Sequence, residues 1–248
     1  MKEEFEKLKK LIDSDKSIDF SPELADFKDP LKVTIVNYAA QQSKLNRIPK
    51  QYKTSKYLDV PNYYKETAWH FIAVTKQWKE VPLPTKEQMN SQMENGLTVW
   101  HCAALRDKFK HVPIIDDFDK INVEQNGNTI LHYLAKSPSL IPDSWLTSEN
   151  LQVKNNEHES VLSEIVNRGK LCENSKLNDI VPWKLLHKIT LAKRFVPRQD
   201  LADFIAIKNK SDPSKYFDLI KDICIKNNIL SETIILPKSV VEIKPFHL

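Results

Sequence analysis

The chain has 248 residues, of which 41% are hydrophobic and 28% charged, and its formal net charge is +4. This composition is typical of a soluble globular protein long enough to bury a sizeable core. No stretch approaches the roughly 18 consecutive apolar residues of a membrane-spanning helix, and the amino terminus, MKEEFEKLKKLIDSDK, lacks the apolar segment of a signal peptide. We therefore expect a cytoplasmic protein.

The first predicted element is an amphipathic helix near the amino terminus. Phe5, Leu8, Leu11 and Ile12 fall on one face at helical spacing, and the opposite face is charged. This pattern favours a helix that caps a stack of other helices. A helix that binds a membrane surface or a partner is the alternative.

A short motif then recurs along the chain. It reads TAWH from Thr67, TVWH from Thr98, TILH from Thr129 and SVLS from Ser160, and each step is 31 residues. A degenerate copy of the motif, TIVN, begins at Thr34. A fixed period of this length indicates stacked supersecondary units that bury their apolar faces against one another.

Each position of the repeat has a physical role. The Thr precedes an apolar run and predicts a helix N-cap, and the Ala six residues later lets a neighbouring helix approach. Asn95-Gly96 and Asn126-Gly127 precede two caps and predict tight turns with positive φ. A proline follows each helix and predicts the first turn of a second helix; these prolines are Pro49, Pro82, Pro113 and Pro142.

The motif resembles the ankyrin repeat, whose signature is Thr-Pro-Leu-His-x-Ala, and it is more similar to divergent bacterial ankyrin-like arrays. The segment LIPDSWLTSENLQVKNN, which begins at Leu140, is similar to those arrays along its length. The signature proline is replaced by Ala, Val or Ile, and the step is shorter than the ordinary period of about 33. The resemblance implies an all-α fold, an α-solenoid of helix-pair repeats with helical end caps.

This interpretation divides the chain into four parts. Residues 1–31 form an amino-terminal helical cap, 32–170 the ankyrin-like repeats, 171–236 decayed repeats with a carboxy-terminal helical cap, and 237–248 a tail. A weak repeat is recovered around Trp183, and YFDLIKDICIKNNIL predicts an amphipathic helix.

Patterns that would carry catalysis or metal binding are absent from the sequence. His70, His101 and His132 cannot share a zinc ion, because equivalent atoms in successive repeats lie about 8–10 Å apart and ligands of one zinc lie within about 4 Å of each other. We expect these rings to bond the turns between repeats. Cys102, Cys172 and Cys224 form no paired motif. No cofactor, metal or small-molecule substrate is expected.

The prediction is therefore a non-enzymatic protein that binds a protein partner through its concave face and turn tips. In the resembling bacterial proteins such arrays act as scaffolds, inhibitors, immunity partners of a toxin, or effectors delivered into a host cell. By analogy with the family, exposed turn positions and one tryptophan are the candidate partner-binding residues: Gln92, Glu94, Glu124, Gln125, Lys154, Asn155 and Trp145.

Two alternatives remain open. Residues 168–226 contain 13 Lys and Arg against 7 Asp and Glu, so a basic patch there could bind nucleic acid. An enzyme site in the irregular segment from Leu171 onward is the other alternative, although the segment offers little room for one.

Overall fold

A computed structural model of the chain describes residues 1–14, 18–113, 123–137, 141–168, 170–171 and 176–181. The chain divides into two compact units, Met1–Ser139 and Leu140–Leu248, and each is considered by itself. Within the described residues the structure is mostly helical and contains no β-strand. To that extent the predicted all-α class is confirmed.

The elements of each unit follow in chain order. The first unit holds α1 (Lys2–Asp13), α2 (Pro22–Asp26), α3 (Ile35–Gln41), η1 (Leu45–Arg47), η2 (Lys50–Tyr52), α4 (Ser55–Leu58), α5 (Ala68–Thr75), η3 (Trp78–Glu80), α6 (Lys86–Met89), α7 (Val99–Leu105), η4 (Phe109–His111) and α8 (Ile130–Lys136), where η denotes a 3₁₀ helix. The described part of the second unit holds η5 (Asp143–Trp145), α9 (Ser148–Gln152), α10 (Val161–Asn167) and α11 (Lys176–Ile180).

The recurring Thr or Ser begins one helix in every repeat. Thr34, Thr67, Thr98, Thr129 and Ser160 are the N-caps of α3, α5, α7, α8 and α10. The Thr34 hydroxyl accepts the Asn37 backbone N–H at 3.2 Å, and the Ser160 hydroxyl accepts that of Ser163 at 3.1 Å. These bonds satisfy N–H groups that have no partner within the helix, so the predicted helix starts are confirmed.

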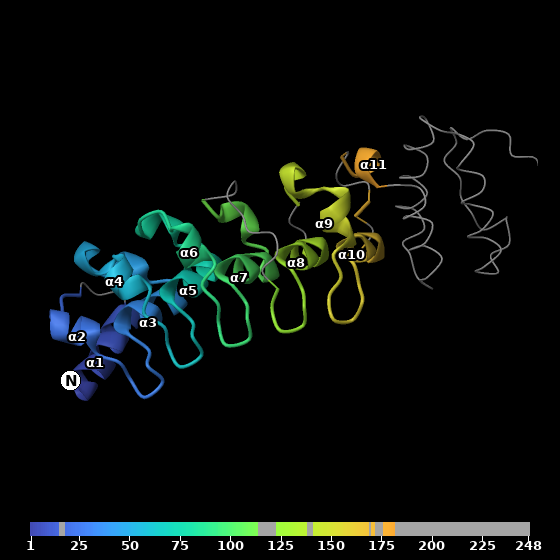
Figure 1. Cartoon of the computed structure of the whole chain (residues 1–248). Helices are drawn as coiled ribbons and strands as arrows, with labels where there is room; N and C mark the ends of the chain where they lie inside the picture. The colour runs from blue at the N-terminus through green and yellow to red at the C-terminus, as the bar shows by residue number, and fades with distance from the viewer. Residues whose placement is uncertain (15–17, 114–122, 138–140, 169, 172–175, 182–248) are drawn as a thin grey trace, which may run out of the picture. The chain divides into compact units, whose positions relative to one another are not determined.

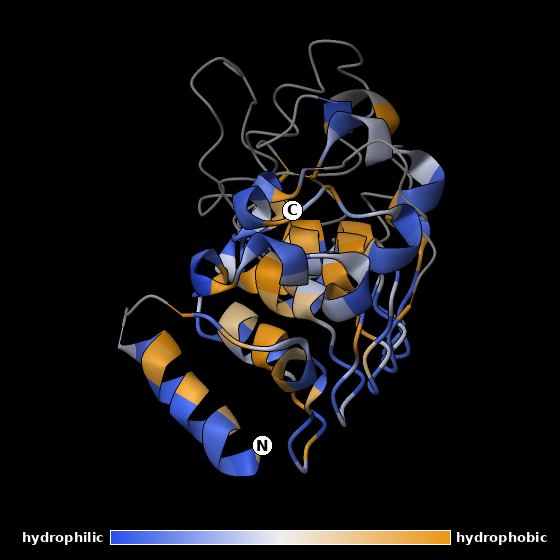
Figure 2. Cartoon of the chain, turned by 90° about the vertical axis from the view of Figure 1, so that its left-hand side faces the viewer, coloured by the Kyte–Doolittle hydropathy of each residue, from blue (hydrophilic) through white to orange (hydrophobic). Residues whose placement is uncertain are grey.

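Within the first unit the repeat helices lie side by side in chain order (Figure 1). Contacts join α1 to α3, α3 to α5, α5 to α7, and α7 to α8. Figure 2 shows apolar residues concentrated in these helices, whereas the turns that project from them are mainly hydrophilic. Small and aromatic side chains of these helices are buried. Six of them are at most 1% exposed: Ala40, Ala73, Ala104, Ala135, Trp69 and Trp100.

The amino-terminal helix buries most of its predicted apolar face. Phe5, Leu8 and Ile12 are buried, and α1 contacts α3. Leu11, which was expected on the same face, is 38% exposed. The apolar stripe of α1 is therefore narrower than predicted.

The predicted start of the second helix is wrong. Pro49 and Pro142 precede the 3₁₀ helices η2 and η5, and α4, α6 and α9 begin later, after the N-caps Thr54, Thr85 and Thr147. A second Thr thus recurs at multiples of the 31-residue step. Proline fits these sites because its restricted φ suits the extended backbone that leads into a 3₁₀ turn.

Beyond Ser160 the structure describes only part of the sequence. The helix α11 lies in the segment that the sequence analysis assigns to decayed repeats. The weak repeat near Trp183, most of the basic segment 168–226, Cys172, Cys224 and the tail lie outside the described residues.

Candidate protein-binding surface

A five-residue turn precedes every repeat helix. We number them turn 1 (residues 29–33), turn 2 (62–66), turn 3 (93–97), turn 4 (124–128) and turn 5 (155–159). In each turn the backbone N–H of the first residue donates to the carbonyl of the fifth, at distances between 2.9 and 3.2 Å. Residues that flank turns 3, 4 and 5 also form isolated antiparallel bridges, such as that between Gln92 and Thr98. The repeat therefore has a constant, backbone-bonded turn.

The fourth residue of every turn has a left-handed backbone. It is Gly96 with φ of 80° in turn 3 and Gly127 with φ of 74° in turn 4, so the predicted positive φ is confirmed. Turns 1, 2 and 5 place Lys32, Lys65 and His158 at the same position, with φ of 57°, 60° and 61°. Because these three turns lack glycine, the sequence pattern did not predict their left-handed backbone.

In every turn except turn 3, the side chain of the first residue accepts backbone N–H groups of the same turn. The Asp29 Oδ1 accepts the backbone N–H groups of Leu31 and Val33, both at 2.9 Å. Asn155 uses its Oδ1 in the same way, and the Glu124 carboxylate accepts the N–H groups of Asn126 and Asn128.

Backbone hydrogen bonds also join each turn of the first unit to the next. The Tyr63 N–H donates to the Leu31 carbonyl at 2.8 Å, and the Glu94 N–H donates to the Tyr64 carbonyl at 3.0 Å. The Gln125 N–H donates to the Asn95 carbonyl at 3.1 Å. The tips of turns 1 to 4 are therefore held at fixed positions along one edge of the row of repeats (Figure 1).

The structure separates the candidate partner-binding residues into two groups. Gln92, Glu94, Gln125 and Lys154 are exposed. Gln125 lies against Glu94, because its Nε2 donates to the Glu94 carbonyl at 3.0 Å. Lys154 belongs to the second unit.

Three candidates were wrongly expected to be exposed. Glu124 and Asn155 are 5% and 6% exposed because their side chains bond the turn amides, and Trp145 is 3% exposed in η5. These side chains stabilise the fold and are not available at its surface.

The sequence interpretation missed three exposed apolar residues on turns 1 and 2. Leu31, Tyr63 and Tyr64 are 51%, 60% and 50% exposed. The two tyrosine rings lie edge to face with centroids 5.4 Å apart. The signal in the sequence was a Tyr-Tyr pair at the position where turns 3 and 4 have Glu-Asn and Gln-Asn.

Gly96→Ala is expected to lower the free energy of unfolding by about 1–2 kcal/mol, whereas Gln125→Ala should change it by less than about 0.5 kcal/mol. A Cβ at Gly96 would lie 3.1 Å from the Glu124 Cα, and its φ is 80°. Gln125 is exposed, so it serves as the control. Urea unfolding measures both changes. If both variants lost the same free energy of unfolding, the close approach of the Gly96 and Glu124 backbones would not be what holds the turn.

The repeated histidines bond the N-caps of their own helices, and His70 also bonds the segment that leads to the next repeat. The Thr67, Thr98 and Thr129 N–H groups donate to the Nδ1 of the histidine three residues later, at 3.1, 3.2 and 3.1 Å. The His70 Nε2 then lies 3.1 Å from the Ser91 carbonyl. In the first repeat Asn37 replaces the histidine, and its Nδ2 donates to the Val60 carbonyl at 3.0 Å. The predicted bond between repeats is thus confirmed for His70.

Burial keeps two reactive side chain types in their neutral forms. It lowers the pKa of His70 to about 4 and raises the pKa of the Cys102 thiol to about 12. The Cys102 Sγ lies 3.6 Å from the Met93 Sδ, among apolar atoms. At neutral pH, therefore, neither residue offers an accessible base or thiolate.

In the part of the chain that the structure describes, no three His, Cys, Asp or Glu side chains are arranged to hold a metal ion. Across the same residues, no helix combines the length and the apolar character needed to cross a membrane.

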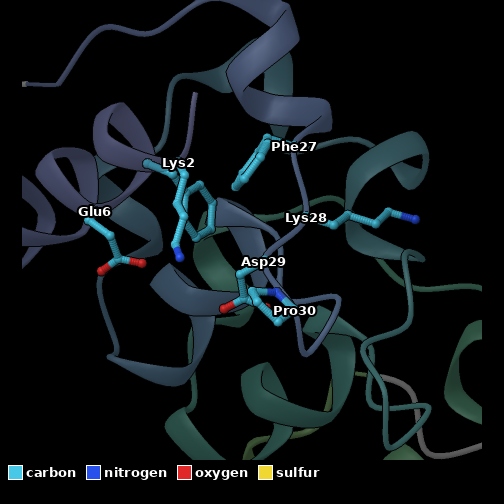
Figure 3. A pocket seen from close by; sticks show the side chains of 7 residues that line it. Lys2, Glu6, Phe27, Lys28, Asp29 and Pro30 are labelled. Carbon is cyan, nitrogen blue, oxygen red and sulfur yellow. The ribbon is translucent and has the colours of Figure 1, made fainter.

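A pocket of about 430 Å³ lies between α1 and the start of turn 1 (Figure 3). Its lining combines the rings of Phe5 and Phe27, whose centroids are 5.0 Å apart, with charged side chains. The Asp29 carboxylate at its rim already accepts two backbone N–H groups and lies 3.4 Å from the Lys9 ammonium. Because this carboxylate is committed to the fold, it is a poor candidate for a general base.

Comparison with known proteins gives no family. No protein-family model matches the sequence, and no curated protein matches it. Among solved structures the chain is similar to one chain of a complex between a predatory endopeptidase from Bdellovibrio bacteriovorus and an immunity protein, at 17% sequence identity and a TM-score of 0.40. The match covers 71% of this chain and 92% of the other chain. At this TM-score the similarity identifies neither a family nor an activity.

Proposed function

We propose that the chain is a non-enzymatic, divergent ankyrin-like repeat protein that binds a protein partner through its turn tips and concave face. The observation that carries this proposal is the row formed by turns 1 to 4. Each turn is bonded to the next through the backbone, and each tip presents exposed side chains. A surface that is ordered before binding loses little conformational entropy when a partner docks.

The buried side chains of the repeats support a binding role. His70 is neutral at physiological pH and already bonds Thr67 and Ser91, and Cys102 is a buried thiol. A catalytic base or nucleophile must instead reach the reacting atom. The repeated residues therefore act as structural links. Scaffold, inhibitor, immunity protein and host-directed effector are the roles that such binding would serve.

The test is affinity capture from the native cell extract with the tagged full chain. Bound material is washed at about 50 mM and then at about 200 mM salt, because nucleic-acid binding weakens steeply over this range. We expect one protein to be retained stoichiometrically at both salts and to bind the chain again after separate purification. Nucleic acid released at the higher salt, with no dominant protein, would instead favour the alternative function through the basic segment 168–226. Retention of neither would overturn the proposal.

A further inference from the structure

Leu31, Tyr63 and Tyr64 form an exposed apolar cluster that spans turns 1 and 2. Single exposed apolar residues are common on protein surfaces, but neighbouring ones mark interaction sites. Here the Tyr63 N–H bonds the Leu31 carbonyl, which fixes the two turns side by side. Tyrosine is also enriched at protein interfaces, where its ring is buried and its hydroxyl group finds a partner.

Two lysines lie beside this cluster at a conformational cost. Lys32 and Lys65 have the left-handed φ that turns 3 and 4 assign to Gly96 and Gly127. Glycine adopts this conformation more readily than lysine does. Turns 1 and 2 therefore present an ammonium group at the position where turns 3 and 4 have no side chain.

The ammonium groups of Lys32 and Lys65 have no direct carboxylate partner among the described residues. Both lysines are exposed, and neither forms an ion pair with another described residue. The carboxylates of the same turns keep their negative charge but bond other groups: Asp29 bonds backbone N–H groups and Lys9, and Glu66 accepts the Asn62 Nδ2 at 2.7 Å. Two like charges at the same position of adjacent turns would be stabilised by an acidic group placed between them.

We propose that Leu31, Lys32, Tyr63, Tyr64 and Lys65 form the docking patch for an acidic protein segment. An apolar side chain of the segment packs on Leu31 and the two tyrosines, while its carboxylates pair with the two lysines. This inference rests on the proposed function and specifies its site and the chemistry of its partner. A nucleic acid fits less well, because the exposed aliphatic Leu31 matches an apolar side chain and offers no aromatic face on which a base could stack.

The test uses a random dodecapeptide library displayed on phage and selected against the full chain. We expect the enriched peptides to carry several Asp or Glu residues beside an aromatic or aliphatic residue. The dominant peptide is then synthesised, and its affinity is measured for the wild-type chain and for two double variants.

The first variant, Lys32→Gly with Lys65→Gly, removes both ammonium groups and also relieves the left-handed backbone. Its thermal stability should not fall, while the peptide should bind at least about tenfold more weakly. The second, Tyr63→Ser with Tyr64→Ser, should weaken binding at least as much. The matched control is Lys50→Gly with Lys79→Gly, which removes two exposed lysines away from the turns and should leave the affinity within about twofold.

The contrary outcomes are distinct. Three results would refute the proposal that the patch binds an acidic segment. They are enriched peptides without acidic residues, no enrichment at all, and equal binding of the peptide by the wild-type chain and the first variant. Single-stranded DNA that binds the chain and is lost in both patch variants would reassign it to nucleic acid. If the protein captured by the wild-type chain is also captured by the patch variants, the proposed function stands and this inference fails. If the wild-type chain captures no protein, the proposed function itself fails.

Discussion

Replacing Gln77 with methionine is expected to lower the free energy of unfolding by about 2–4 kcal/mol. The buried Gln77 side chain joins two repeats: its Oε1 accepts the Leu45 N–H at 2.7 Å, and its Nε2 donates to the Ala40 carbonyl at 2.8 Å. Methionine has a similar length but replaces neither bond, so the buried Leu45 N–H loses its partner. Urea unfolding followed by far-ultraviolet circular dichroism measures the change.

Gln41→Met is the matched control for this variant. Gln41 is the last residue of α3 and is exposed, so the substitution should change the free energy of unfolding by less than about 0.5 kcal/mol. Equal losses from Gln77→Met and Gln41→Met would show that the bonds between the repeats contribute nothing. A loss of stability in Gln77→Met alone would show that the bonds from Gln77 to Leu45 and Ala40 stabilise the end of α3.

Acidification is expected to remove up to about 3 kcal/mol of stability through His70. Burial lowers the pKa of His70 from 6.5 to about 4, so the folded chain holds the neutral ring. Below pH 6.5 the unfolded chain binds a proton that the folded chain does not. The stabilisation is therefore complete above pH 6.5, falls as the pH approaches 4, and does not fall further below the folded pKa. Urea unfolding at several pH values measures it.

His70→Asn isolates this contribution from the other titrating groups. Asn37 occupies the same position of the first repeat and donates to the Val60 carbonyl, so asparagine can reproduce the bond to Ser91. At pH 7.5 the variant should lose about 1–2 kcal/mol, because the Thr67 N–H loses its acceptor. Between pH 6.5 and 4 its stability should fall less than that of wild type. Parallel curves would contradict the link between His70 burial and acid sensitivity.

Features that depend on a few neighbouring residues could be predicted from the sequence. The N-caps at Thr98 and Ser160 and the left-handed glycine at Gly96 involve atoms no more than four residues apart. The bond from His70 to Ser91 joins distant segments, but the resemblance to ankyrin repeats implied it. The second caps, such as Thr85, were not predicted although they recur at multiples of 31 residues, because the prolines before them are themselves typical of a first helical turn.

Exposure could not be predicted from the same pattern. Gln125 and Glu124 are adjacent in turn 4, yet one side chain is exposed and the other bonds the turn amides. Trp145 could have been a surface anchor or a core residue from its sequence alone, and the structure buries it. The Tyr63-Tyr64 pair was not recognised as a turn because Lys65 takes the place of glycine.

The period, the N-caps of the first helix of each repeat and the glycine turns follow from the sequence, because capping and positive φ are local properties of a short segment. Which turn residues stay exposed, and which groups join one repeat to the next, depends instead on how the repeats stack. Gln77 reaches residues more than thirty positions earlier in the chain, and that approach exists only when the repeats are stacked. The exposed Leu31, Tyr63 and Tyr64 become a single surface for the same reason, since a bond between two separate turns brings them together.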